Sequence, residues 1–147
     1  MIYLAADHGG FKLKEEIKSE FDKTGIVYED LGALKLTPDD DYPDYSIPAA
    51  RKVSENPTEN KAILLCRAGS GEVIVANKFP GVRAALSWNA EHARKSREDN
   101  DANVLALPAN YIDSETAKEI IGVWLNTDFS NATRHVRRLQ KIAEIDK

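Results

Sequence analysis

Short apolar runs alternate with helical patterns along the whole chain, and this alternation limits the fold more than any other feature. Between the runs, apolar residues recur at helical spacing, as at Leu13, Ile17 and Phe21. Parallel strands need right-handed crossover connections, which the predicted helices supply. The sequence therefore predicts an α/β fold with one doubly wound, five-stranded parallel sheet and helices on both faces. This arrangement is Rossmann-like, with the flavodoxin-type strand order 2-1-3-4-5. The predicted strands are Ile2–Ala6, Ile26–Leu31, Ala62–Cys66, Val82–Leu86 and Val104–Leu107.

Several residues mark the ends of the predicted helices. Gly25 is expected to end the first helix, and Asp113 or Ser114 to cap the one before the C-terminal segment. An extra helix is expected from about Thr133 to Glu144, packed on a partner or on a sheet edge. The one long loop is Leu34–Asp44. Since no repeat or linker interrupts the pattern, residues 1–147 are expected to form a single domain.

Composition narrows the class of partner. The 147 residues are 42% apolar and 30% charged, with a net charge of −4. A chain-wide surface for nucleic acid or membrane is not expected from such a balance. Neither a basic, apolar leader nor an apolar stretch near 18 residues is found in the sequence, so we expect no secretion signal and no membrane span. The single cysteine excludes an internal disulfide and suits a reducing cytoplasm.

Chemistry-bearing residues gather where the third predicted strand ends. There the chain enters a turn of small residues, Cys66-Arg67-Ala68-Gly69-Ser70-Gly71-Glu72, and then a helix. Such a turn aims backbone N–H groups at an anion, here beside a thiol and a carboxylate. In these sheets ligands bind at the carboxyl ends of the strands. The other strand ends there lead into Asp7-His8-Gly9-Gly10, Asp41-Tyr42-Pro43 and Pro108-Ala109-Asn110. We therefore expect chemistry on a small phosphorylated or enolisable substrate.

These residues also have plain structural interpretations. Asp7 can cap a glycine turn, Cys66 can be a small buried side chain, and Glu72 can be favoured by the helix dipole. Arg134 and Arg138, one helical turn apart, fit either a solvated basic face or a phosphate clamp. The three histidines and the single thiol lack the spacing of a metal site. Glycine fingerprints for dinucleotides and nucleoside triphosphates are absent from the sequence. No metal and no cofactor are expected.

Taken together, the residues resemble the ribose-5-phosphate isomerase B family, which includes the galactose-6-phosphate isomerase subunits. The likeness covers nearly the whole chain and is most specific at Ala76-Asn77-Lys78 and at Arg134-His135 with Arg138. It implies metal-free aldose–ketose isomerisation of a sugar phosphate through an enediolate. It also implies a homodimer with active sites at the interface, the C-terminal helix reaching across to the partner, with pairing into tetramers left open.

The resemblance also implies roles for individual residues. Members of the family use as base either a cysteine at the position of Cys66 or a glutamate at that of Glu72. This chain has both, and we favour Glu72, with Cys66 as the alternative. Asp99 is a candidate acid, and Arg67 with the Gly69, Ser70 and Gly71 amides would hold the oxyanion. The expected sugar-binding residues are Asp7, His8, Tyr42 and Asn100, and the expected phosphate-binding residues are His8, Arg134, His135 and Arg138.

Three departures from the family pattern bear on the substrate. Arg67 and Ala68 stand where members have glycine and then serine or threonine. Asp99 replaces a histidine associated with ring opening, and Asn110 replaces an arginine that binds phosphate. The expected substrate is ribose 5-phosphate or a related pentose, tetrose or hexose phosphate. The missing histidine favours an open-chain or shorter sugar phosphate, which needs no ring opening, over ribose 5-phosphate itself. The competing interpretations are a non-catalytic sugar-phosphate-binding protein or inactive subunit and, less favoured, an isomerase of non-phosphorylated substrates.

Overall fold

Five parallel strands form the single sheet of the computed structural model, which describes residues 1–146. The strands are β1 (Ile2–Ala6), β2 (Tyr28–Asp30), β3 (Lys61–Cys66), β4 (Ala84–Leu86) and β5 (Val104–Pro108). The helices are α1 (Phe11–Thr24), α2 (Pro43–Glu55), α3 (Ser70–Ala76), α4 (Ala90–Asn100), α5 (Ser114–Leu125) and α6 (Thr133–Ala143). The predicted fold class is confirmed.

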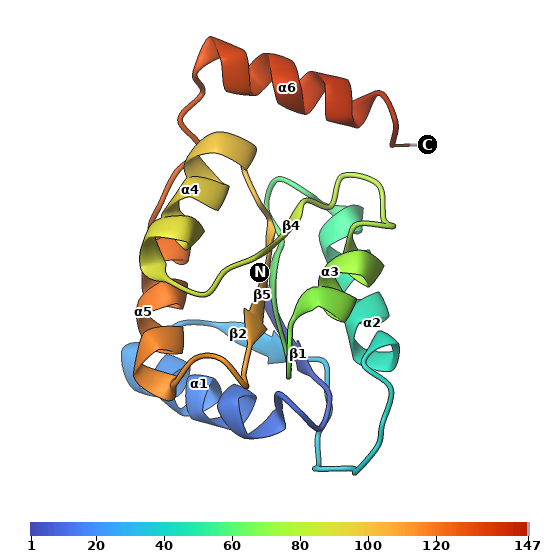
Figure 1. The fold of residues 1–147 in the computed structure, drawn as a ribbon, viewed down its shortest axis with the longest axis vertical. Helices are drawn as coiled ribbons and strands as arrows, with labels where there is room; N and C mark the ends of the chain where they lie inside the picture. The colour runs from blue at the N-terminus through green and yellow to red at the C-terminus, as the bar shows by residue number, and fades with distance from the viewer. Residues whose placement is uncertain (147) are drawn as a thin grey trace.

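Both faces of the sheet are covered, as Figure 1 shows. On one face, Leu4 and Ala6 pack with apolar residues of α1, α4 and α5. On the other face, Tyr3 and Ala5 pack with residues of α2 and α3. Because successive strand residues point to opposite faces, a strand covered on both sides reads as a continuous apolar run. This is why the central strands were recognisable as unbroken apolar segments.

The predicted order of the last two strands is wrong. The observed order is β2-β1-β3-β5-β4, so β5 lies beside β3 and β4 forms the edge. All five residues of β5 are buried, whereas the three residues of β4 are partly exposed. A fully buried strand gains most from the centre of the sheet, and a short edge strand limits unwanted pairing. After β3 the chain therefore forms the edge strand β4 first, and then returns to place β5 between β3 and β4.

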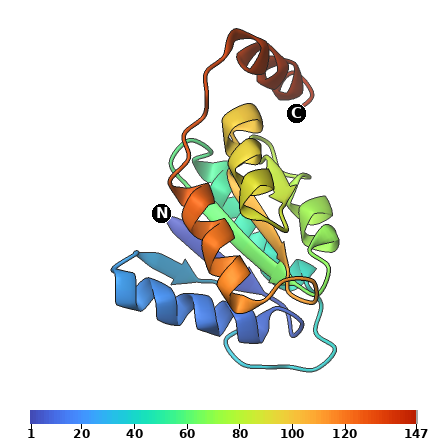
Figure 2. The ribbon, with the colours of Figure 1, turned by 60° about the vertical axis from the view of Figure 1, so that its left-hand side comes forward.

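Several predicted helix ends are confirmed. Gly25 ends α1 in the left-handed conformation, at φ 74°. The Asp113 side chain accepts a hydrogen bond from the Thr116 N–H and caps α5. The last helix, expected over Thr133–Glu144, is α6. Figure 2 shows it standing away from the rest of the chain after an extended connection. None of the helices within residues 1–146 is long and apolar enough to span a membrane.

The turn that leads into α1 packs closely against β3 at Gly10, and this contact leads to a prediction about stability. A Cβ atom at Gly10 would lie 2.1 Å from the carbonyl oxygen of Leu65. Backbone atoms cannot yield as a flexible side chain does, so we expect Gly10→Ala to lower the free energy of unfolding by about 2–3 kcal/mol. The control is Gly122→Ala within α5, where a Cβ meets nothing within 4 Å. It should stabilise the chain by up to about 1 kcal/mol. Urea unfolding of both variants measures the difference, and equal effects would contradict the packing argument.

Candidate active site

The turns that follow β1 and β3 meet at the carboxyl end of the sheet. The two strands are neighbours, with Ala6 opposite Leu65. The aliphatic part of the Arg67 side chain lies against Gly9. A Cβ atom placed on Gly9 would lie 2.4 Å from Arg67 Cγ. Likewise, a Cβ atom at Gly71 would come within 2.6 Å of the Tyr42 ring. The structure thus brings together the predicted site residues of three chain segments.

The turn after β3 is arranged around the Cys66 sulfur. Gly69 takes the left-handed conformation, at φ 77°, and its N–H donates to Cys66 Sγ over 3.0 Å. The N–H groups of Ser70 and Gly71 belong to the first turn of α3, where helical partners are lacking. Within residues 1–146, no acceptor takes a hydrogen bond from either group. Two main-chain donors therefore remain available at this turn, as a developing oxyanion requires.

Glu72 is the most unusual residue of the site. Its side chain is fully buried, and neither carboxyl oxygen has a hydrogen-bond partner within residues 1–146. Burial raises the pKa of Glu72 well above its ordinary value, and the negative charge of Asp7 raises it further. The adjacent Cys66 thiol offsets part of this rise. A buried carboxyl group without partners destabilises the fold, so a functional role is the natural explanation for its presence.

Cys66 shares this environment. Burial, followed by the charge of Glu72, raises the pKa of the Cys66 thiol to about 12, although the Gly69 N–H favours the thiolate. At neutral pH the thiol is therefore protonated and cannot act as a base. For Glu72 the raised pKa also means that its carboxylate, once formed, is a stronger base than an ordinary glutamate. These pKa shifts favour Glu72 over Cys66 as the proton acceptor.

Asp7 and His8 begin the turn that connects β1 to α1. Asp7 Oδ1 accepts hydrogen bonds from the N–H groups of Gly9 (2.9 Å) and Gly10 (3.2 Å), so its interpretation as a turn cap is confirmed. The ring of His8 contacts Asp40, with His8 Nδ1 2.6 Å from Asp40 Oδ1. Sequence reasoning missed Asp40. The only available signal was the acidic run within the long loop, because nothing in the sequence shows that this loop folds back onto His8.

Five predicted site residues lie elsewhere in this chain. Because α4 starts beyond the carboxyl end of β4 and ends just before β5, its last residues, Asp99 and Asn100, lie at the amino end of the sheet. His135 of α6 is buried there, with Nε2 3.3 Å from Asp99 Oδ1, whereas Arg134 and Arg138 are exposed. Figure 1 shows α6 beyond the upper end of α4, while the arrow of β5 points downward, away from it. One chain therefore does not assemble all the predicted groups around Glu72.

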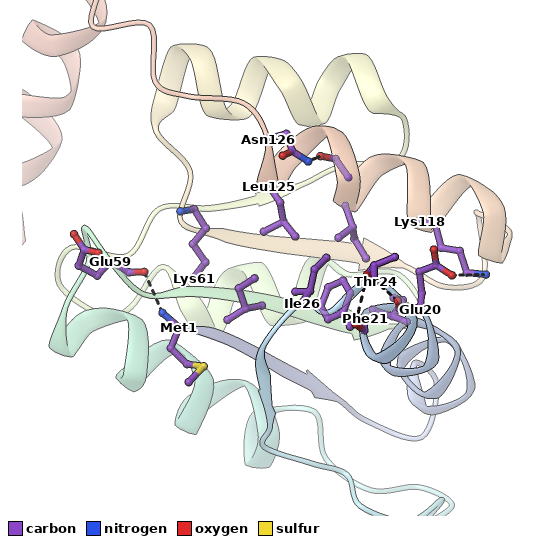
Figure 3. Close-up of a pocket in the computed structure, with 14 residues that line it drawn as sticks. Met1, Glu20, Phe21, Thr24, Ile26, Glu59, Lys61, Lys118, Leu125 and Asn126 are labelled. Carbon is purple, nitrogen blue, oxygen red and sulfur yellow. Dashed lines mark hydrogen bonds and ion pairs between the residues drawn. The ribbon is translucent and has the colours of Figure 1, made fainter.

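A separate cavity of about 450 Å³ also lies at the amino end of the sheet, between α1 and α5 (Figure 3). Its walls are mainly apolar, and the ion pair between Lys118 and Glu20 stands at one side. The cavity contains none of the predicted site residues. It is therefore distinct from the site formed by the turns that follow β1 and β3, which we call the strand-end site. The principal apolar residues of its lining are Ile17, Phe21, Ile26, Ile121 and Leu125.

Comparison with known proteins places this geometry in a family. Residues 2–142 match the Ribose/Galactose Isomerase family. Ribose-5-phosphate isomerase B of Mycobacterium tuberculosis is 38% identical over 146 residues, which cover 99% of this chain and 90% of that protein. The structure of ribose-5-phosphate isomerase B from Mycoplasma genitalium with bound ribulose-5-phosphate superposes with a TM-score of 0.94 at 34% identity, covering 97% of this chain and 93% of the other. The structure of the Thermotoga maritima ribose 5-phosphate isomerase superposes with a TM-score of 0.92 at 40% identity, covering 98% of this chain and 97% of the other. The chain therefore belongs to the ribose/galactose isomerase family of sugar-phosphate isomerases, as its motifs indicated.

Proposed function

We propose that the protein interconverts the aldose and ketose forms of a sugar phosphate by proton transfer through an enediolate. The observation that carries this proposal is the buried, unpartnered Glu72 carboxyl group beside the free amides of the β3 turn. Glu72 takes a proton from the carbon next to the carbonyl group and returns it to the neighbouring carbon. The Ser70 and Gly71 N–H groups stabilise the oxyanion that forms in between. Since Glu72 is enclosed, substrate must displace part of the surface over it.

The remaining groups are proposed to come from a second copy of the chain. Arg134 and Arg138 share one face of α6, which extends from the domain and contacts little of it beyond α4. In a homodimer, this helix would deliver both guanidinium groups, with His135, to the phosphate at the partner's strand-end site. Asp99 and Asn100 would arrive with them, because the His135–Asp99 contact ties α6 to the end of α4. A cytoplasmic location fits the single thiol.

The substrate is proposed to be an open-chain or short-chain sugar phosphate. Asp99 occupies the position of the ring-opening histidine and is engaged by His135 within its own chain. Arg67 is exposed, and its stem lies over Gly9 beside the β1 turn, where its positive charge can reach an anionic substrate. Catalysis by this arrangement requires no metal and no cofactor.

The proposal predicts exchange of substrate hydrogen with solvent. In D₂O, incubation with a panel of tetrose, pentose and hexose phosphates should place deuterium at the carbon next to the carbonyl group, which NMR detects. We expect the highest kcat/KM for a substrate other than ribose 5-phosphate. Clear preference for ribose 5-phosphate would contradict the substrate proposal. Binding without exchange for every sugar phosphate would instead favour a sugar-phosphate-binding protein or an inactive subunit.

A further inference from the structure

A carboxylate far along the chain holds the His8 ring. Asp40 Oδ1 lies 2.6 Å from His8 Nδ1 and also accepts a hydrogen bond from the His8 backbone N–H over 2.8 Å. The Asp40 side chain is 7% exposed and the His8 side chain 20%. One oxygen atom therefore fixes both the main chain and the ring of His8, and this double contact distinguishes it from a solvated surface ion pair.

The charge of Asp40 determines which ring nitrogen carries a proton. Burial alone would raise the pKa of Asp40, but hydrogen bonds from the His8 backbone and ring, aided by the nearby Tyr45 hydroxyl, lower it overall. An ionised carboxylate can only accept, so His8 Nδ1 must donate. Nε2 has no hydrogen-bond partner among residues 1–146 and is the nitrogen left for a ligand.

The loop that carries Asp40 runs from the end of β2 to the start of α2, and its first residues are held by hydrogen bonds. Ala6 and the loop exchange two backbone hydrogen bonds, Ala6 N–H to Gly32 O (2.8 Å) and Ala33 N–H to Ala6 O (2.7 Å). The fully buried Lys14 ammonium group donates to Ala33 O over 2.8 Å and pairs with Asp30. These contacts join the start of the loop to the end of β1, next to His8. The Asp40–His8 contact therefore belongs to a loop that is anchored to the strand-end site by its own hydrogen bonds.

We propose that Asp40 is a positioning residue for the isomerase site. It locks the orientation and the protonated nitrogen of His8, so that Nε2 meets the substrate in a fixed geometry. In such a carboxylate–histidine pair the carboxylate acts through the histidine, so Asp40 is proposed to influence the substrate only through His8. This inference rests on the proposed function in one respect, namely that His8 binds the sugar phosphate.

The test compares Asp40→Ala with Asp39→Asn as the matched control. Asp39 is the exposed acidic neighbour, and no hydrogen bond joins it to His8. Nitrogen–proton correlation spectra of the imidazoles, recorded where the ring is neutral, should show the proton on Nδ1 in the wild type and in Asp39→Asn. In Asp40→Ala it should move to Nε2. Loss of His8 signals in His8→Asn assigns them among the three histidines.

Kinetics then measure what the positioning contributes. We expect Asp40→Ala to lower kcat/KM by about 10- to 100-fold, the usual effect of losing a hydrogen bond to a charged group. In the His8→Asn background the same change should alter kcat/KM less than about twofold, because the two residues act through one contact. A structural role alone would lower both backgrounds equally, and that result would overturn the proposal.

The spectra and the kinetics separate this inference from the proposed function. A wild-type proton on Nε2, or an unchanged ring in Asp40→Ala, would overturn the role of Asp40 even if the enzyme isomerises sugar phosphates. Absence of isomerisation with every sugar phosphate would refute the proposed function. In that case the spectra still decide whether Asp40 fixes the ring.

Discussion

Replacing Glu72 by glutamine is expected to lower kcat by about 100- to 10,000-fold, the usual contribution of a positioned general base. Glutamine keeps the shape of the side chain but cannot accept a proton from carbon. The exchange of substrate hydrogen with D₂O should fall by the same factor, while KM changes little. Because burial raises the pKa of Glu72, the acidic limb of the wild-type kcat/KM profile should lie above the ordinary pKa of a glutamate.

The same substitution should make the fold less sensitive to pH. The pKa of Glu72 is higher in the folded chain than in the unfolded chain, so between these two values the folded chain binds the extra proton. The stability of the wild type therefore falls as pH rises from the ordinary glutamate pKa towards the raised one. In Glu72→Gln this decline should be absent. Thermal unfolding at several pH values measures it, and the expected combination of lost activity with retained stability marks a functional group.

Cys66→Ala is the control for the assignment of the base. A thiol with a pKa of about 12 is neutral at working pH, so its removal should cost far less activity than Glu72→Gln. The opposite ranking of the two variants would transfer the role of the base to Cys66. Equal losses would indicate a coupled pair in which the proton belongs to both groups.

Local patterns were sufficient to predict the elements of the sheet and one half of the site. The strand-end residues Asp7, His8, Cys66 and Glu72 could be placed together because parallel strands present their carboxyl ends at one edge. The order of β4 and β5 could not be predicted in this way, since it depends on which strand buries more surface. Periodicity within a single strand gives no information about its neighbours.

Contacts between residues that are far apart in the chain could not be predicted either. Nothing in the run Asp39–Asp41 indicates which of its carboxylates reaches His8, because a loop's path is set by its anchors, here Lys14 and Ala33. The buried state of Glu72 was equally hidden, since a first-turn helix glutamate is usually exposed and favoured by the dipole. The sequence contained the charges, but their environment arises only from packing.

The placement of α6 leads to the second large effect, which concerns the site as an assembly of two chains. Arg134 and Arg138 are exposed on a helix that lies at the opposite end of the sheet from Glu72. We expect Arg134→Ala/Arg138→Ala to reduce kcat/KM about 100-fold or more, because two charge-assisted hydrogen bonds to phosphate are lost. On its own, this loss would not show which chain supplies the arginines.

Co-expression of the two defective chains, Glu72→Gln and Arg134→Ala/Arg138→Ala, should restore activity. If each site takes Glu72 from one chain and the arginines from the other, a mixed dimer has one site with both defects and one intact site. Random pairing then makes about a quarter of all sites intact, and differently tagged chains allow the mixed dimer to be purified with about half of its sites intact. If the arginines served Glu72 of their own chain, every site would carry one defect and mixing would restore nothing. Recovery of activity in the mixed dimer therefore tests directly whether α6 completes the site of its partner, because neither parent protein contains an intact site.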